Sequence, residues 1–142
     1  MNLPIIIQNV VYRKNKKDFE VLMLKRAQNR GGFWNVVNGT LELGESIIQC
    51  RERELREETG ITKTLGWSDE INRFSFIYKN YTIVVIVFSV AVSPTQTVTI
   101  NEEHTEFRWM KFDEAISLMK FAEDRQGLEI CSRRLTEGGI KY

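Results

Sequence analysis

The chain contains 142 residues, of which 42% are hydrophobic and 27% are charged, and its formal net charge is +1. This length and composition predict one globular domain that spans residues 1–142. The nearly balanced charge argues against a nucleic-acid-binding protein that works through bulk positive charge.

The first part of the chain predicts a hairpin of two strands. Residues 5–12 and 19–26 are rich in apolar and β-branched side chains, and the polar run 13–18 between them reads as a turn. The apolar start is short, is broken by polar residues and has no basic leader. We therefore expect no signal peptide and a cytoplasmic location.

An acidic helix follows this hairpin. A loop over residues 27–32 and a short strand over 33–37 lead toward it, and Gly39 and Gly44 predict a tight loop at its entry. We expect the helix itself over residues 47–59.

Local signals mark both ends of this helix. Ser46 and Gln49 have the spacing of a capping box, which starts a helix, and Gly60 stands where a left-handed residue ends one. Ile48 and Leu55 lie seven residues apart, so we expect them to form an apolar strip beside the charged face.

The middle of the chain predicts a second hairpin. Aromatic residues alternate along 70–78, and Lys79 and Asn80 form a possible two-residue turn. Residues 81–92 are apolar on both faces, which is typical of a central strand covered on both sides. The apolar run 83–92 is too short to span a bilayer, so we expect no membrane partner.

The last third predicts a loop over 93–101, a strand over 105–110 and two helices, over 113–120 and 124–136. Asp113 and Asp124 are the expected N-caps of these helices, and Gly138 with Gly139 is the expected end of the second one. Helices on both sides of a mixed sheet make an α/β (α+β) fold, an α/β/α sandwich. The two cysteines, Cys50 and Cys131, are too few for a disulfide framework or a zinc site.

The acidic residues of the helix over 47–59 share one face. Glu54, Glu57 and Glu58 recur at i, i+3 and i+4, which brings three like charges together at an electrostatic cost. A hard divalent cation with oxygen ligands, Mg²⁺ or Mn²⁺, would offset that cost. Such an ion suits a substrate that is itself a phosphate anion, because it neutralises phosphate oxygens and activates water.

The stretch from Gly39 to Ile61, GTLELGESIIQCRERELREETGI, resembles the Nudix box of the Nudix hydrolases. That pattern is G, five residues, E, seven residues, then R-E-aliphatic-x-E-E-x-G-aliphatic, and every position is matched here. The matching residues are Gly39, Glu45, Arg53, Glu54, Leu55, Glu57, Glu58, Gly60 and Ile61. The resemblance implies the Nudix fold and the hydrolysis of a diphosphate linked to another moiety.

The resemblance also implies roles for the box residues. Glu54, Glu57 and Glu58 would be metal ligands, with the Gly39 carbonyl as a further one, and Arg53 would orient a carboxylate through its planar fork. Glu45, the first glutamate of the box, would tie the entry loop to the helix.

A second acidic position lies outside the box, in the stretch NEEHTEFRW. Many Nudix enzymes use a carboxylate there as a further metal ligand or as the general base, and Glu103 is our candidate, with Glu102 as the alternate. Only one of two neighbours would face the site if this segment were a strand. His104 is the only histidine, and we interpret it as a structural residue rather than a catalyst.

Three residues are candidates for binding the substrate. Arg26 ends the second predicted strand and could bind a phosphate. Trp34 could stack with Phe33 on a flat heterocycle, and the Asn38 amide could donate to and accept from the edge of that ring. We take Phe74, Phe76 and Trp109 as core residues.

Beyond the box, the runs VLMLKR, FWNVVNGTLELGES, EEH with RW, and DRQ resemble bacterial dihydroneopterin triphosphate diphosphatases within this family. The expected partner is then a small phosphorylated molecule, a pterin or (deoxy)nucleoside triphosphate, and the expected oligomeric state is a monomer or a homodimer. Hydrolases of dinucleoside polyphosphates or of oxidised dNTPs share the same box. A Nudix-fold module that binds nucleotides without cleaving them is the non-enzymatic alternative, but such a module would be expected to lose box glutamates.

Overall fold

The computed structural model describes residues 2–138, and within them eight strands form one mixed sheet. The first strand, β1 (Asn2–Asn15), lies at the centre of this sheet. It pairs in parallel with β7 (Tyr81–Ala91) along one edge, and antiparallel with β2 (Asp18–Arg26) and β4 (Val37–Glu42). Residues 5–12 therefore form a buried strand, as predicted.

The remaining strands extend the sheet on both sides of β1. β3 (Trp34–Asn35) and β8 (His104–Lys111) pair with β2, and β5 (Gly66–Trp67) and β6 (Asn72–Tyr78) pair with β7. Lys79 and Asn80 have φ angles of 49° and 67°, and both join β6 to β7 as the two-residue turn that their position predicted.

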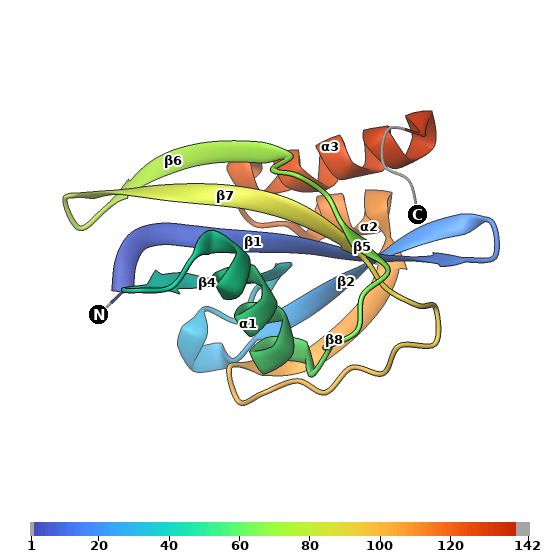
Figure 1. Cartoon of the computed structure of the whole chain (residues 1–142), viewed down its shortest axis with the longest axis horizontal. Helices are drawn as coiled ribbons and strands as arrows, with labels where there is room; N and C mark the ends of the chain where they lie inside the picture. Colours follow the sequence, from blue (N-terminus) through green and yellow to red (C-terminus); the bar gives the residue numbers. More distant parts are fainter. Residues whose placement is uncertain (1, 139–142) are drawn as a thin grey trace.

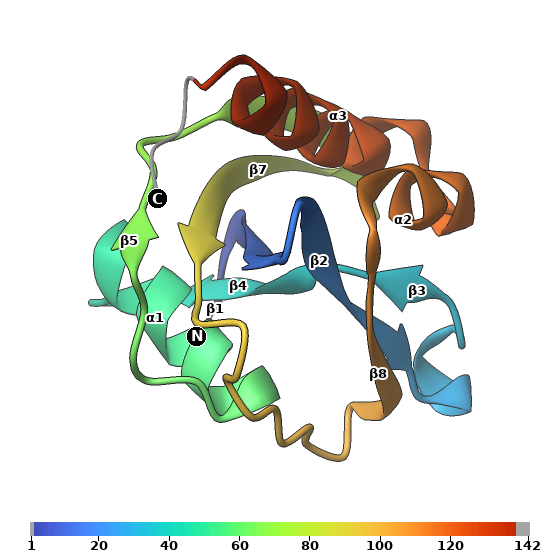
Figure 2. The same cartoon turned by 90° about the vertical axis from the view of Figure 1, so that its right-hand side faces the viewer.

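Helices cover both faces of the sheet, as Figures 1 and 2 show. One face carries α1 (Ile47–Thr59), and the other carries α2 (Phe112–Leu118) and α3 (Ala122–Glu137). A 3₁₀ turn, η1 (Gln28–Arg30), follows β2. The layers are those of the predicted α/β/α sandwich. In the described part of the chain, no helix has both the length and the apolar character needed to cross a bilayer.

The hydrophobic core lies in two layers on either side of the sheet. Val10 and Val87 pack against Leu128 of α3, and on the opposite face Leu22 and Val90 pack against Leu55 of α1. Val10 and Val11, which are neighbours in β1, belong to different layers, because the side chains of a strand alternate between its two faces.

The signals at the ends of α1 are confirmed. The Ser46 hydroxyl accepts from the Gln49 N–H at 3.0 Å, the Gln49 side chain accepts in return from the Ser46 N–H at 2.9 Å, and Gly60 has a left-handed φ of 74°. The predicted apolar strip is half wrong. Leu55 is buried, but Ile48 is 47% exposed, because Ile47 and Cys50 are the residues of the first turn that pack against the sheet.

Two expected helix caps are wrong. Asp113 lies inside the first turn of α2, where its carboxylate accepts from the Glu114 N–H at 2.9 Å. Asp124 lies inside the first turn of α3, and its carboxylate instead accepts from the Gln8 side chain of β1 at 2.7 Å. Gly138 ends α3 with a φ of 74°, whereas Gly139 lies outside the described residues.

Candidate active site

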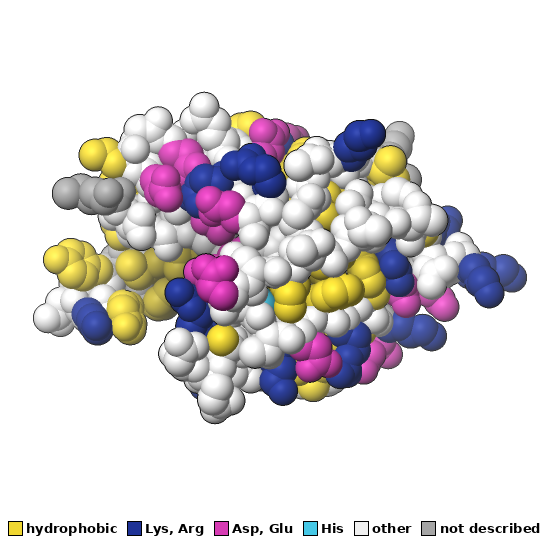
Figure 3. All heavy atoms as spheres, turned by 90° about the horizontal axis from the view of Figure 1, so that it is seen from below, with side chains coloured by type: hydrophobic (Ala, Val, Ile, Leu, Met, Phe, Trp, Pro, Cys, Tyr) yellow, Lys and Arg dark blue, Asp and Glu magenta, His cyan; other side chains and the backbone are white. Residues whose placement is uncertain are grey.

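Glu54, Glu57 and Glu58 of α1 face a polar cleft of about 650 Å³, which we call the carboxylate cleft. On the face shown in Figure 3, acidic and basic side chains gather side by side, and the single histidine is visible beside them. The predicted site residues that line this cleft are Arg26, Asn38, Gly39, Arg53, Glu54, Glu57, Glu58, Glu102 and Glu103. Residues from four separate segments therefore meet in one place.

Arg53 is the centre of a network that joins the entry loop to the helix face. Its Nε and Nη2 donate to the two oxygens of Glu45 at 2.6 and 3.0 Å, and Nη2 also donates to the Thr40 carbonyl at 3.0 Å. Its Nη1 donates to Glu54 at 2.7 Å and to Glu57 at 3.0 Å. The guanidinium thus ties the loop to the helix and orients two carboxylates at once.

Glu45 has the loop-tying contacts that the box predicted. Besides Arg53, its carboxylate accepts from the backbone N–H of Glu42 at 3.1 Å. The hydrogen bond from Arg53 is the main cause that lowers the pKa of Glu45 to about 2. This carboxylate is therefore ionised throughout the pH range in which a hydrolase works.

Glu54 and Glu58 are buried, with 7% and 4% of their surface exposed. Burial is the main cause that raises the pKa of Glu54, and burial with the charge of Glu54 raises the pKa of Glu58 to about 9. Burial therefore opposes the ionisation of both neighbouring carboxyl groups, and a cation bound between them would offset that cost.

Gly39 lies in β4 rather than in the tight loop that we predicted, and its lack of a side chain has a specific reason. A Cβ atom built on Gly39 would overlap the carboxyl group of Glu54. Only glycine therefore lets the Glu54 carboxylate lie directly against the β4 backbone.

The donor set of the cleft fits a hard divalent cation. Glu54, Glu57, Glu58 and the Gly39 carbonyl all supply oxygen, the ligand that Mg²⁺ and Mn²⁺ prefer. Within residues 2–138, no three acidic, histidine or cysteine side chains already surround one metal-sized position. The Arg53 guanidinium instead engages oxygens of Glu54 and Glu57.

Glu102 and Glu103 both line the carboxylate cleft, so the strand alternation that was to separate them does not apply. They lie in a turn that precedes β8, where Asn101 accepts from the Glu103 N–H through its side chain at 3.2 Å. The Glu103 carboxylate forms an ion pair with Arg30 at 3.1 Å, and its carbonyl accepts from the Ala27 N–H at 2.9 Å. Glu103 is thus anchored from two directions.

His104 is buried beside this turn. Its Nδ1 lies 3.3 Å from the Asn101 side-chain oxygen, and its Nε2 lies 3.9 Å from Glu58. Burial is the main cause that lowers the pKa of His104, and the nearby Arg26 acts in the same direction. The imidazole is therefore neutral at pH 7, which suits the structural role that we expected.

Two arginines stand on the rim of the carboxylate cleft. Arg26 donates from Nε to the carbonyl of Arg30 at 2.9 Å, and its guanidinium lies 5.5 Å from the centre of the Phe33 ring. Arg30 was missed by sequence reasoning, since a lone arginine in a loop carries no motif. Arg30 reaches the cleft because the turn after β2 packs against the turn before β8, where Arg30 pairs with Glu103.

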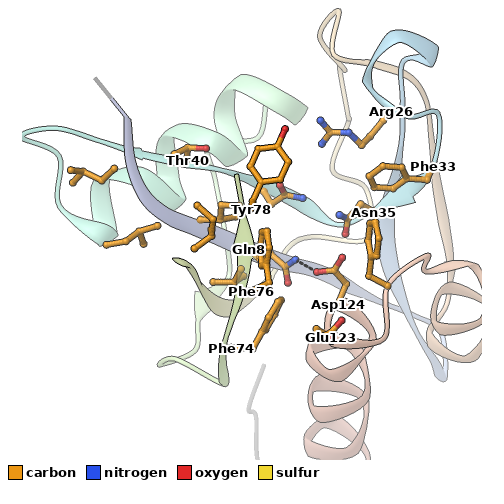
Figure 4. Close-up of a pocket in the computed structure, with 17 residues that line it drawn as sticks. Gln8, Arg26, Phe33, Asn35, Thr40, Phe74, Phe76, Tyr78, Glu123 and Asp124 are labelled. Carbon is orange, nitrogen blue, oxygen red and sulfur yellow. Dashed lines mark hydrogen bonds between the residues drawn. The ribbon is translucent and has the colours of Figure 1, made fainter. Parts of the chain in front are cut away.

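A second cleft, of about 710 Å³, adjoins the first, and we call it the aromatic cleft. The two share Arg26, Asn38 and Thr40 in their linings. Phe33 lines the aromatic cleft, as Figure 4 shows. Trp34 is placed differently from our prediction, because it packs against the core below α3 and Arg108 covers its ring at 5.0 Å.

Phe76 also differs from its prediction as a core residue. It is 41% exposed and lines the aromatic cleft together with Phe74 and Tyr78. The period-two spacing of these aromatic residues along β6 is correct, but the face that they share opens onto a cleft.

Comparisons with known proteins agree with this geometry. The model of the NUDIX domain matches residues 5–129. Nucleoside triphosphatase NudI of Escherichia coli K12 is 30% identical over 112 residues, which cover 71% of this chain and 79% of NudI. An octanoyltransferase of Myxococcus xanthus is 36% identical over 118 residues, but this chain, 82% of which is covered, spans only 32% of that protein's length.

Among solved structures, the dihydroneopterin triphosphate pyrophosphohydrolase of E. coli superposes with a TM-score of 0.77 at 28% identity. The match covers 90% of this chain and 94% of that one. The shared fold includes the mixed sheet and the helices on both of its faces.

Proposed function

Because the chain belongs to the Nudix hydrolase family, we propose that it hydrolyses a (deoxy)nucleoside or pterin triphosphate to a monophosphate and pyrophosphate. Dihydroneopterin triphosphate is the leading candidate. The observation that carries this proposal is the junction of two clefts, one lined by carboxylates and arginines and the other by aromatic rings. A triphosphate attached to a flat heterocycle has these same two parts.

The proposed cofactor is Mg²⁺ or Mn²⁺, held by Glu54, Glu57, Glu58 and the Gly39 carbonyl, with Glu103 as a further ligand or as the general base. When bound, such an ion neutralises phosphate oxygens and makes water a better nucleophile. The raised pKa values of the buried glutamates support this proposal, since a cation would offset the cost of ionising both.

The chain's own residues have separate tasks in this reaction. Arg53 keeps Glu54 and Glu57 in position through its hydrogen bonds. Arg26 and Arg30 bind phosphate oxygens and hold the chain of phosphates across the cleft. In the general-base role, Glu103 takes the proton of the attacking water, whose oxygen bonds to one phosphorus while the bond from that phosphorus to the oxygen that bridges the α and β phosphates breaks. The monophosphate and pyrophosphate then leave.

A side-by-side assay tests the proposal. Dihydroneopterin triphosphate, dATP, an 8-oxo-purine dNTP, diadenosine tetraphosphate and ADP-ribose are incubated with the protein and Mg²⁺, and products are identified by chromatography. We expect the highest kcat/KM for the pterin triphosphate and release of pyrophosphate. A clear preference for diadenosine tetraphosphate or ADP-ribose, or release of single orthophosphate, would reject the pterin assignment and leave the family membership intact.

A further inference from the structure

The floor of the aromatic cleft carries buried polar groups that the hydrolysis itself does not use. Gln8 of β1 is 3% exposed, and its Nε2 donates to Asp124 of α3 at 2.7 Å. This hydrogen bond occupies one carboxylate oxygen of Asp124 and leaves the other free to accept. Figure 4 shows this pair between Phe33 on one side and the aromatic residues of β6 on the other.

Asn35 supplies the complementary group. It is 8% exposed, lines the same cleft, and its side-chain oxygen accepts from the Val36 N–H at 2.8 Å. This bond settles the orientation of the amide, so that the NH₂ group of Asn35 is the part left to donate. The floor therefore presents one acceptor, at Asp124, and one donor, at Asn35.

The walls of the cleft favour a flat ring. Phe74, Phe76 and Tyr78 project from one face of β6 and line the cleft. Phe33 and Phe121 also line it, and their rings contact each other edge to face with centres 5.7 Å apart. Aromatic faces on two sides of a cleft with a polar floor suit a heterocycle whose edge points toward that floor.

We propose that Asp124 and Asn35 select heterocycles with the amino-lactam edge that guanine and pterins share, and discriminate against adenine. In that edge a ring carbonyl accepts a hydrogen bond, and the neighbouring ring N–H and amino group donate. Asn35 donates to the carbonyl, and Asp124 accepts from the N–H groups. Adenine would instead turn its amino group toward the Asn35 donor and its bare ring nitrogen toward the carboxylate.

This inference rests on the proposed function, because a heterocycle in the aromatic cleft belongs to a substrate only if its phosphates bind in the carboxylate cleft. Burial supports it, as it is the main cause that raises the pKa of Asp124. Asp124 is partly buried, and a carboxylate in such a position gains more from two N–H donors of a ligand than a fully exposed one does.

The kinetic test compares dGTP with dATP in the presence of Mg²⁺. We expect the wild type to favour dGTP in kcat/KM by on the order of 10-fold to 100-fold, the discrimination of a good paired contact. In Asp124→Asn the amide keeps its bond from Gln8 but turns an NH₂ group toward the ring, so the preference should vanish or reverse. Glu129→Gln, an exposed change of the same kind on α3, is the matched control and should keep the ratio.

A binding test needs no hydrolysis and separates this inference from the proposed function. Guanosine, neopterin and adenosine are titrated into ¹⁵N-labelled wild type, and the side-chain NH₂ resonances of Gln8 and Asn35 are followed by NMR. We expect shifts with guanosine and neopterin that are several-fold larger than with adenosine.

The outcomes are distinct. If no triphosphate is hydrolysed, the proposed function fails, and the NMR titration alone decides whether the floor selects the amino-lactam edge. If triphosphates are hydrolysed but the ratio of dGTP to dATP is near one and does not change in Asp124→Asn, the inference is overturned and the proposed function stands. Equal NMR shifts with adenosine and guanosine also overturn it.

Discussion

Replacing Gly39 with alanine tests the closest packing in the carboxylate cleft. The backbone of Gly39 does not have a positive φ, so alanine is compatible with the strand itself. The added Cβ, however, would overlap the Glu54 carboxyl group, which is buried and held by Arg53. The substitution should therefore act on one catalytic carboxylate and on little else.

The size of the effect follows from the displacement. To reach ordinary van der Waals contact with the new Cβ, the Glu54 carboxylate must recede by at least about 1 Å. A misplacement of this size in an active site costs on the order of 100-fold in rate, about 2.7 kcal/mol in the activation free energy. Overpacking should also lower the free energy of unfolding by about 1–3 kcal/mol.

The assay measures kcat on the best triphosphate with saturating Mg²⁺, together with thermal unfolding. Gly44→Ala is the control, because Gly44 has a φ of 86° but a Cβ there would meet no atom within 4 Å. It should cost about 1–2 kcal/mol of stability through backbone strain and leave kcat unchanged. If Gly39→Ala keeps kcat within about threefold of the wild type, the close approach of Glu54 has no catalytic importance and this reasoning is wrong.

Three further predictions concern the acidic residues. Glu57→Gln should lower turnover by about 1,000-fold or more without unfolding the protein, since this side chain is half exposed. EDTA should have the same effect on the wild type, and activity that persists in EDTA would contradict the proposed metal requirement. Glu103→Gln should reduce kcat far more than Glu102→Gln, because Glu103 is the one anchored through Arg30, and the reverse order would transfer the role to Glu102. Glu45→Gln should lower the melting temperature at pH 7. Because Arg53 lowers the pKa of Glu45 from 4.5 to about 2, the difference in melting temperature between the variant and the wild type should shrink as the pH falls from 4.5 to 2. A difference that stays constant over this range would contradict the ion pair.

The sequence alone determined the features that depend on neighbours along the chain. The ends of α1 were predictable because Ser46, Gln49 and Gly60 act on backbone groups within a few residues. The same holds for the turn at Lys79 and Asn80 and for the shared face of Glu54, Glu57 and Glu58, since helical periodicity alone brings these glutamates together.

Local signals failed where a distant partner offered a better contact. Asp124 was expected to cap α3, but its carboxylate lies against Gln8, 116 residues earlier in the chain. Periodicity correctly gave Phe74, Phe76 and Tyr78 one face, yet it could not say that this face opens onto a cleft. The spacing of residues along a strand predicts which side chains share a face, but it does not predict whether that face packs against the core or lines a cleft.

Only the tertiary structure brought the turn before β8 to the turn after β2. That meeting paired Arg30 with Glu103 and put both Glu102 and Glu103 beside the glutamates of α1. It also turned Phe33 into the aromatic cleft and left Trp34 packed on the core. The different placements of Phe33 and Trp34 depend on how β2 pairs with β3, because the register of a sheet decides which of two adjacent side chains faces each side.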